Sequence, residues 1–141
     1  MKTTFSDFDE FLQGFLAAAF WSSTIDGDGY MEGQQVPLDD EYEPSQLTER
    51  AKTILTAHAM SFWSRMWFYL DHEIEPKASC IGDHSPSKAG HDFWLTSAGH
   101  GAGFWDGDWP KYGDMLTKLS KCYPCEHINF YITDDGDVDI G

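Results

Sequence analysis

The feature that most constrains the fold of this chain is the stretch 89–107, AGHDFWLTSAGHGAGFWDG. It holds two Phe-Trp pairs, Phe93-Trp94 and Phe104-Trp105, on either side of a glycine-rich segment. Aromatic residues favour strands and small residues favour turns, so the pattern predicts a β-hairpin with strands near 92–96 and 102–106. Neighbouring side chains of a strand point to opposite faces, so each pair places one large ring on each side of the sheet. Both faces then need cover, or one of them is a binding surface.

Length and composition predict a single domain, 1–141, with a helical half (1–75) and a β-rich half (89–141). Of the 141 residues, 41% are hydrophobic and 16% aromatic, which is enough to build a core. The remaining pattern predicts helices over 7–22, from near Pro44 to Leu70, and over 114–121, with strands near 128–133 and 137–140. Residues 26–43 and 74–89 are predicted to be connections. The expected fold class is α+β: two N-terminal helices packed on a small antiparallel sheet of about four strands, with a short helix in the C-terminal half.

The formal net charge of −15 narrows the classes of partner. It opposes direct binding of nucleic acid and of anionic membranes, and it favours a basic protein partner. No segment approaches the ~20 apolar residues of a membrane span. The apolar run 11–21 follows Asp7 and Asp9, whereas a signal peptide has a basic region there. Three cysteines, an odd number, fit a reducing compartment, so the sequence predicts a cytosolic protein.

Several motifs together resemble a family of small acidic proteins encoded by bacteriophages. They are Phe20-Trp-Ser-Ser-Thr24 followed by Asp-Gly, His91-Asp-Phe-Trp-Leu-Thr96, Gly99-His-Gly-Ala-Gly-Phe-Trp-Asp106, and a closing strand with Asp134-Asp-Gly136. The resemblance implies a phage origin and a setting in the host cytoplasm, and it implies no activity. Members of the family carry Arg-Asn where this chain has Ser97-Ala98.

The same motifs supply candidate chemical groups. The predicted hairpin brings His91 and Asp92 near Asp106, with His100 in its turn. Imidazole and carboxylate groups bind metals or act as general bases. The alternative, which we favour, is that His91 and Asp106 tie the base of the hairpin while Trp94 and Trp105 pack in the core.

Cysteine spacing gives a second, weaker signal. Cys122-x-x-Cys125 is followed by His127, with Cys80 as a conceivable fourth ligand, but the set is incomplete for a zinc site. The Asp-Gly turns at 26–29 and 135–139 lack the glycine and glutamate positions of an EF-hand. We therefore expect incidental thiols, no bound metal and no cofactor.

The positive case for function comes from the uneven distribution of acids, which are dense at 26–43 and 134–139. We expect a phage-encoded binding protein that acts on a basic host protein. A more specific version of this hypothesis is that the protein imitates DNA and inhibits a host nucleic-acid-binding or defence enzyme. Its predicted contact residues are Asp26, Asp28, Glu32, Asp39, Asp40, Glu41 and Glu43. Trp63 and Trp67, in the apolar end of the second helix, are a further candidate interface. The alternatives are a small metal-dependent enzyme using His91, Asp92 and Asp106, and a structural accessory of the phage; a homo-oligomer stays open.

Overall fold

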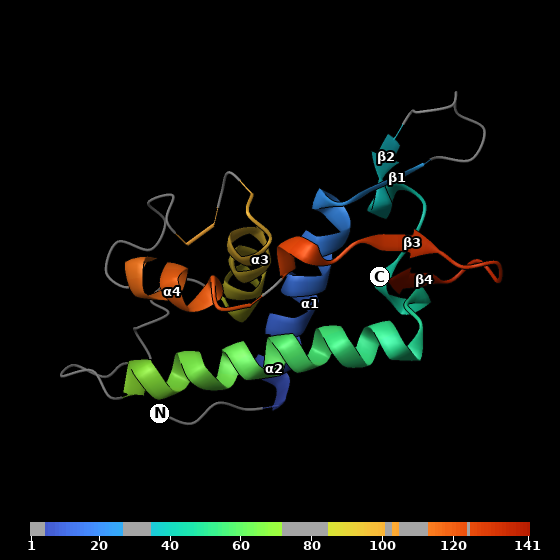
Figure 1. Cartoon of the computed structure of the whole chain (residues 1–141). Coiled ribbons are helices and arrows are strands. Elements are labelled where there is room, and N and C mark those ends of the chain that lie inside the picture. Colours follow the sequence, from blue (N-terminus) through green and yellow to red (C-terminus); the bar gives the residue numbers. More distant parts are fainter. Residues whose placement is uncertain (1–4, 27–34, 72–84, 101–102, 105–112, 124) are drawn as a thin grey trace.

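A computed structural model describes residues 5–26, 35–71, 85–100, 103–104, 113–123 and 125–141. The described helices are α1 (Phe5–Ser22), α2 (Glu49–Asp71), α3 (Pro86–Ser97) and α4 (Gly113–Ser120). Two-stranded antiparallel pairs are formed by β1 (Thr24–Asp26) with β2 (Gln35–Pro37), and by β3 (Phe130–Ile132) with β4 (Val138–Ile140). Figure 1 shows α2 lying along one side of the group formed by α1, α3 and α4. The chain therefore combines helices with small antiparallel sheets, and helix dominates the described part.

Helix α1 confirms the prediction for 7–22. Phe11, Phe15 and Phe20 recur at helical spacing and are all buried. The predicted short helix over 114–121 is also confirmed as α4, and the predicted strands near 128–133 and 137–140 as β3 and β4. The predicted helix start near Pro44 is a separate 3-10 turn, Pro44–Gln46, and α2 begins only at Glu49. Local periodicity was sufficient for these elements because each presents one apolar face to the core.

The predicted hairpin over 92–106 is wrong. Residues 86–97 form α3, and neither Gly103 nor Phe104 lies in a strand; Trp105 and Asp106 lie outside the described residues. Ser85 caps the helix, because its hydroxyl oxygen accepts from the backbone N–H of Lys88 at 3.1 Å, and Pro86 occupies the first turn. Strand propensity is overridden because this helix is buried on nearly every side, so its aromatic residues find their partners in the core.

Loss of that hairpin also overturns the expected four-stranded sheet. The two strand pairs are separate sheets, and the N-terminal helices do not pack on one common sheet. The half 89–141 is not β-rich in its described part, since it contains most of α3 and all of α4. The region 26–43, predicted to be a connection, contains β2 and a 3-10 turn, Leu38–Asp40, in its described part.

The core is a stack of aromatic rings between three helices. Phe62 of α2 stacks on Phe93 of α3, with ring centroids 4.0 Å apart. Phe11 of α1 lies 5.9 Å from Phe62, and Phe104 lies 5.8 Å from it on another side. The backbone N–H of Phe104 donates to Thr96 Oγ1 at 3.0 Å, which holds this residue against α3. Aromatic pairs contribute about 0.5–1.5 kcal/mol beyond the area that they bury, so the stack orients the helices as well as joining them.

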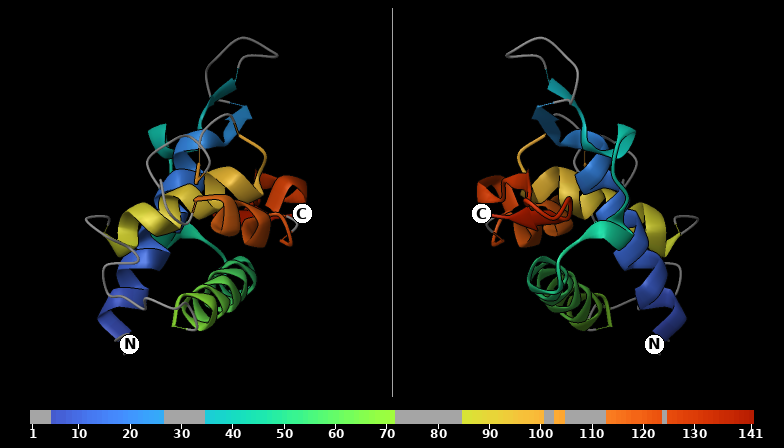
Figure 2. Two further views of the ribbon diagram at one scale, coloured as in Figure 1. Left: turned by 90° about the vertical axis from the view of Figure 1, so that its left-hand side faces the viewer. Right: turned by 90° about the vertical axis from the view of Figure 1, so that its right-hand side faces the viewer.

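Helices α1 and α3 cross at glycines. Gly14 of α1 faces the backbone of Ser87, and Gly90 of α3 faces the backbone of Phe11. Figure 2 shows the two helices crossing in contact, with α2 set apart from the crossing. Only glycine allows such an approach, because a Cβ at either position would meet backbone atoms of the other helix.

The C-terminal strand pair is anchored to the start of α2. The backbone N–H of Thr48 donates to the carbonyl of Val138 at 2.9 Å. Asp139 accepts from the hydroxyls of Thr48 and Tyr131, and its carboxylate lies 3.0 Å from the Arg50 guanidinium. Within the described part of the chain, no helix is long and apolar enough to cross a membrane.

Candidate functional site

Most of the predicted acidic contact residues that the structure describes lie in one short turn. Asp39, Asp40, Glu41 and Glu43 are all exposed. Asp26 belongs to β1, while Asp28 and Glu32 lie outside the described residues. None of the four carboxylates between 39 and 43 has an ion pair with a described residue. We call residues 38–43 the acidic turn.

Hydrogen bonds and one buried side chain hold the acidic turn in place. Leu38 is fully buried, and its backbone N–H donates to the carbonyl of Ser23 at the end of α1, at 2.8 Å. The N–H of Tyr42 returns to the carbonyl of Leu38 at 3.0 Å, and the N–H of Glu43 donates to the side chain of Gln46 at 2.9 Å. The carboxylates are therefore displayed on an anchored segment.

Trp63 and Trp67 do not form an exposed interface. They are only 4% and 7% exposed, and Trp63 packs on Phe11 with ring centroids 4.9 Å apart. The two indoles meet edge to face at 5.6 Å. The prediction of a docking surface at these residues is wrong, because the apolar side of α2 is occupied by α1. Among the residues that the structure describes, the large exposed apolar ones are instead Trp21, Met60, Phe68 and Tyr131.

His91 and Asp92 are adjacent in α3 and have different surroundings. Asp92 is buried, with one carboxylate oxygen 3.5 Å from Lys88 Nζ and the other 3.7 Å from His91 Nδ1. His91 is half-buried, and its ring lies 5.8 Å from that of the exposed Trp21. Asp106 lies outside the described residues, so the proposed grouping of His91 and Asp92 with it is not tested.

Trp94 is buried, as predicted, at 2% exposure. Its indole Nε1–H donates to Ser22 Oγ at 2.7 Å, which joins α3 to the end of α1. Both residues line a pocket of about 260 Å³ at that junction. The described residues lining this polar pocket are Ser22, Ser23, Thr24, Trp94, Ala98, His100, Cys125, Ile128, Asn129 and Phe130.

The polar pocket brings together segments that are distant in the sequence. Ser22, Ser23 and Thr24 come from the end of α1 and from β1, His100 follows α3, and Asn129 precedes β3. No sequence pattern joins them: the predicted first helix ends at Ser22, and the predicted hairpin has His100 in its turn. Asn129 carried no signal at all. Their common location follows from the crossing of α1 and α3.

Cys125 borders the polar pocket as a neutral thiol. Burial raises its pKa from 9.0 to about 11, while a hydrogen bond with Ser97 lowers it by less. A thiol with such a pKa is protonated near neutral pH, so Cys125 supplies no thiolate nucleophile there. Cys122, in contrast, is exposed, and both thiols are free. Cys80 lies outside the described residues, and among those that are described no three His, Cys, Asp or Glu side chains converge as a metal site would require.

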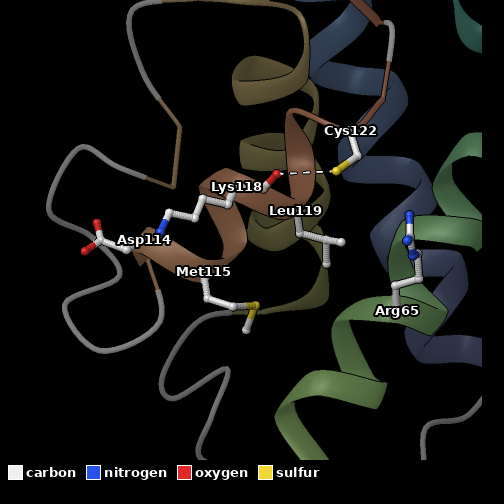
Figure 3. Close-up of a pocket in the computed structure, with 6 residues that line it drawn as sticks. All are labelled: Arg65, Asp114, Met115, Lys118, Leu119 and Cys122. Carbon is white, nitrogen blue, oxygen red and sulfur yellow. Dashed lines mark hydrogen bonds between the residues drawn. The ribbon is translucent and has the colours of Figure 1, made fainter.

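A larger hollow of about 500 Å³ lies between α2 and α4. Figure 3 shows Met115 and Leu119 pointing into the space that faces α2, where Arg65 lies opposite. Lys118 instead extends along α4 toward Asp114 and away from Arg65. The hollow thus has an apolar floor, and its two cationic side chains do not converge on one point.

Comparisons with known proteins add no assignment to this geometry. No family model, curated protein or solved structure matches the chain.

Proposed function

We propose that this chain is an acidic binding protein whose acidic turn docks on a basic surface of another protein. The observation that carries the proposal is the anchored display of exposed carboxylates at 39–43 that have no ion pair with a described residue. A partner's Lys and Arg side chains meet these groups without first displacing an internal cation. Because the backbone of the turn is already fixed, association orders little of this surface, which reduces the entropic cost.

The second acidic cluster, residues 134–139, contains one carboxylate that is bonded within its own fold. Asp139 is engaged by Thr48, Tyr131 and Arg50 within its own fold. Asp134, Asp135 and Asp137 are exposed on the turn between β3 and β4. They provide an internal comparison, because the same number of charges can be removed there.

An exposed aromatic residue lies on the helix that anchors the turn. Trp21 is 58% exposed, two positions before the Ser23 carbonyl that holds Leu38. Tryptophan is enriched among the residues that dominate binding energy at protein interfaces. Its ring also attracts guanidinium and ammonium groups, worth about 0.5–1 kcal/mol at an exposed site. A Lys- and Arg-rich partner therefore fits both the charge and the aromatic residue.

In its most specific form, the proposal is that a phage uses this protein in the host cytoplasm to occupy the basic nucleic-acid groove of a host enzyme. The support is the net charge of −15 together with the resemblance of the motifs around Trp21 and Trp94 to small acidic phage proteins. A metal-dependent enzyme and a structural accessory of the phage remain as alternatives, and no contact among the described residues favours either one.

The test uses a fluorescent nona-arginine peptide as a basic probe and the full chain as its ligand. We expect binding to weaken as NaCl rises, because exposed charges are screened beyond about 8–10 Å at physiological ionic strength. A triple variant, Asp39→Asn/Asp40→Asn/Glu41→Gln, should weaken binding more than the matched variant Asp134→Asn/Asp135→Asn/Asp137→Asn. Both remove three charges from exposed positions, and Glu43 is kept because it is the N-cap residue of the 3-10 turn Pro44–Gln46.

Equal loss in the two triple variants would contradict the proposal, since net charge alone would then explain binding. The DNA-mimic form has a separate test. Basic proteins captured by the parent chain from a bacterial lysate should be released by duplex DNA and should not be captured by the 39–41 variant. Capture that is indifferent to DNA would overturn mimicry while leaving the docking surface intact.

A further inference from the structure

We propose that the polar pocket at the end of α1 binds a small uncharged molecule bearing several hydroxyl groups, of the size and chemistry of a monosaccharide. The pocket lies at the junction of α1, α3 and the segment that precedes β3. Its location and chemistry are independent of the acidic turn, so the proposal stands apart from the proposed protein partner.

The lining groups define the chemistry of the ligand. Hydroxyls from Ser22 and Ser23, the amide of Asn129 and the imidazole of His100 can each both donate and accept hydrogen bonds. Ser22 Oγ already accepts from Trp94, so its own proton is available to a ligand oxygen. Such groups complement hydroxyls, which also donate and accept.

The charge pattern of the described lining residues favours a neutral ligand over a charged one. Among the described lining residues there is no Asp, Glu, Lys or Arg, although 23% of the chain is charged. Among these lining residues a cationic ligand finds no carboxylate partner, and an anionic ligand finds no Lys or Arg in a chain of net charge −15. A neutral polar molecule carries neither penalty.

Size and shape fit the same class. The volume of about 260 Å³ lies just below the ~300–1,000 Å³ range of pockets for drug-sized ligands. Phe130, which is partly buried, adds apolar surface to the lining. A sugar ring offers both kinds of surface, because its C–H groups pack on aromatic side chains while its hydroxyls bond to polar ones.

The pocket is also held in shape before any ligand arrives. The Trp94–Ser22 hydrogen bond of 2.7 Å fixes α3 to α1, and Ser23 is held at both backbone groups, by Ala19 and Leu38. The thiol of Cys125 is neutral and buried, so the site is built for binding rather than for thiolate chemistry.

The experiment follows the tryptophan indole N–H signals of the 15N-labelled full chain by NMR. The chain has six tryptophans, and the Trp94 signal is assigned as the one that moves in Ser22→Ala. We expect glucose or N-acetylglucosamine at millimolar concentration to shift the Trp94 signal in a saturable manner. Inorganic phosphate and spermidine, as anionic and cationic probes, should leave it in place.

Two variants locate the binding. Asn129→Ala and His100→Ala change exposed side chains, so they should fold like the parent, and each should weaken binding of the sugar about 2–10-fold by removing one neutral hydrogen bond. Gln13→Ala removes an exposed amide from α1 outside the pocket and should bind like the parent. The proposal is overturned if no sugar moves the Trp94 signal, if phosphate or spermidine moves it and sugars do not, or if Asn129→Ala and Gln13→Ala bind equally well.

Discussion

Replacement of Gly90 by alanine tests the packing of α1 on α3. In an exposed helix, alanine is more favourable than glycine by about 0.5–1 kcal/mol, so local propensity predicts stabilisation. At Gly90 the added Cβ would instead meet the carbonyl oxygen of Phe11 in close contact, and it would lie 2.8 Å from the backbone nitrogen of Phe15. Backbone atoms inside a helix cannot swing aside, so the helices must separate.

The expected cost follows from that separation. Overpacking of a core costs about 1–3 kcal/mol and occasionally more. Moving α3 away from α1 also loosens the contact of Phe15 with Phe93, whose rings stack at 5.2 Å. We expect a net loss of about 2–3 kcal/mol, which lowers the melting temperature by roughly 4–12 °C in a domain of this size.

Thermal unfolding followed by circular dichroism, together with urea titration, measures the effect. Ala17→Gly, at an exposed position of α1, calibrates the propensity term and should cost about 1 kcal/mol. Gly14→Ala should behave like Gly90→Ala, because its Cβ would meet the backbone of Ser87. The double variant should lose less than the sum, since one separation relieves both contacts. A Gly90→Ala protein that melts at or above the parent temperature would refute the close crossing.

Three further outcomes follow from the described contacts. Ser22→Ala should destabilise the fold by about 1–3 kcal/mol in urea titration, because the buried Trp94 indole N–H loses its acceptor. The pKa of Asp139 is lowered, chiefly because its carboxylate accepts from the backbone N–H of Ile140. The contribution of this carboxylate to the stability of the fold is therefore present above pH 3.8 and is lost as pH falls below that value. Asp139→Asn should flatten the acid side of a plot of unfolding free energy against pH. Because the pKa of Cys125 is raised to about 11, the contribution of its neutral thiol to the stability of the fold is complete below pH 9.0 and is lost as pH rises to about 11. In a Cys80→Ser background at pH 8, an aromatic disulfide reagent should therefore label the exposed Cys122 rapidly and the buried Cys125 slowly.

The sequence was sufficient to predict a helix or strand wherever one face of the element is apolar and its ends carry local signals. Helix α1 shows this most clearly, since its phenylalanines recur at helical spacing and its end at Ser22 matched the prediction. The final strand pair was likewise predicted by alternation and by the Asp-Gly turn at Gly136, whose φ of +84° favours glycine. These choices depend on residues within a few positions of one another.

For the candidate sites, too, the sequence predicted the features that depend on neighbouring residues and missed those that depend on distant contacts. The sequence placed the carboxylates of Asp39 and Asp40 on the surface, because a turn rich in acids has to be solvated. It could not assign the anchoring of that turn to Ser23, nor the burial of Trp63, because both depend on contacts between separate segments. The polar pocket was missed for the same reason.

The identity of α3 was decided only by tertiary structure. Phe93 and Trp94 have strand propensity, yet Ser85 and Pro86 carry the start signal of a helix, and the aromatic residues dominated the prediction. What decides between the two is Gly90, because it lets α3 approach α1 closely enough to bury Phe93 and Trp94 on several sides at once. Propensity amounts to tenths of a kcal/mol per residue, whereas burial of a large aromatic side chain contributes about 1.5–3 kcal/mol, so the long-range contact outweighs the local preference.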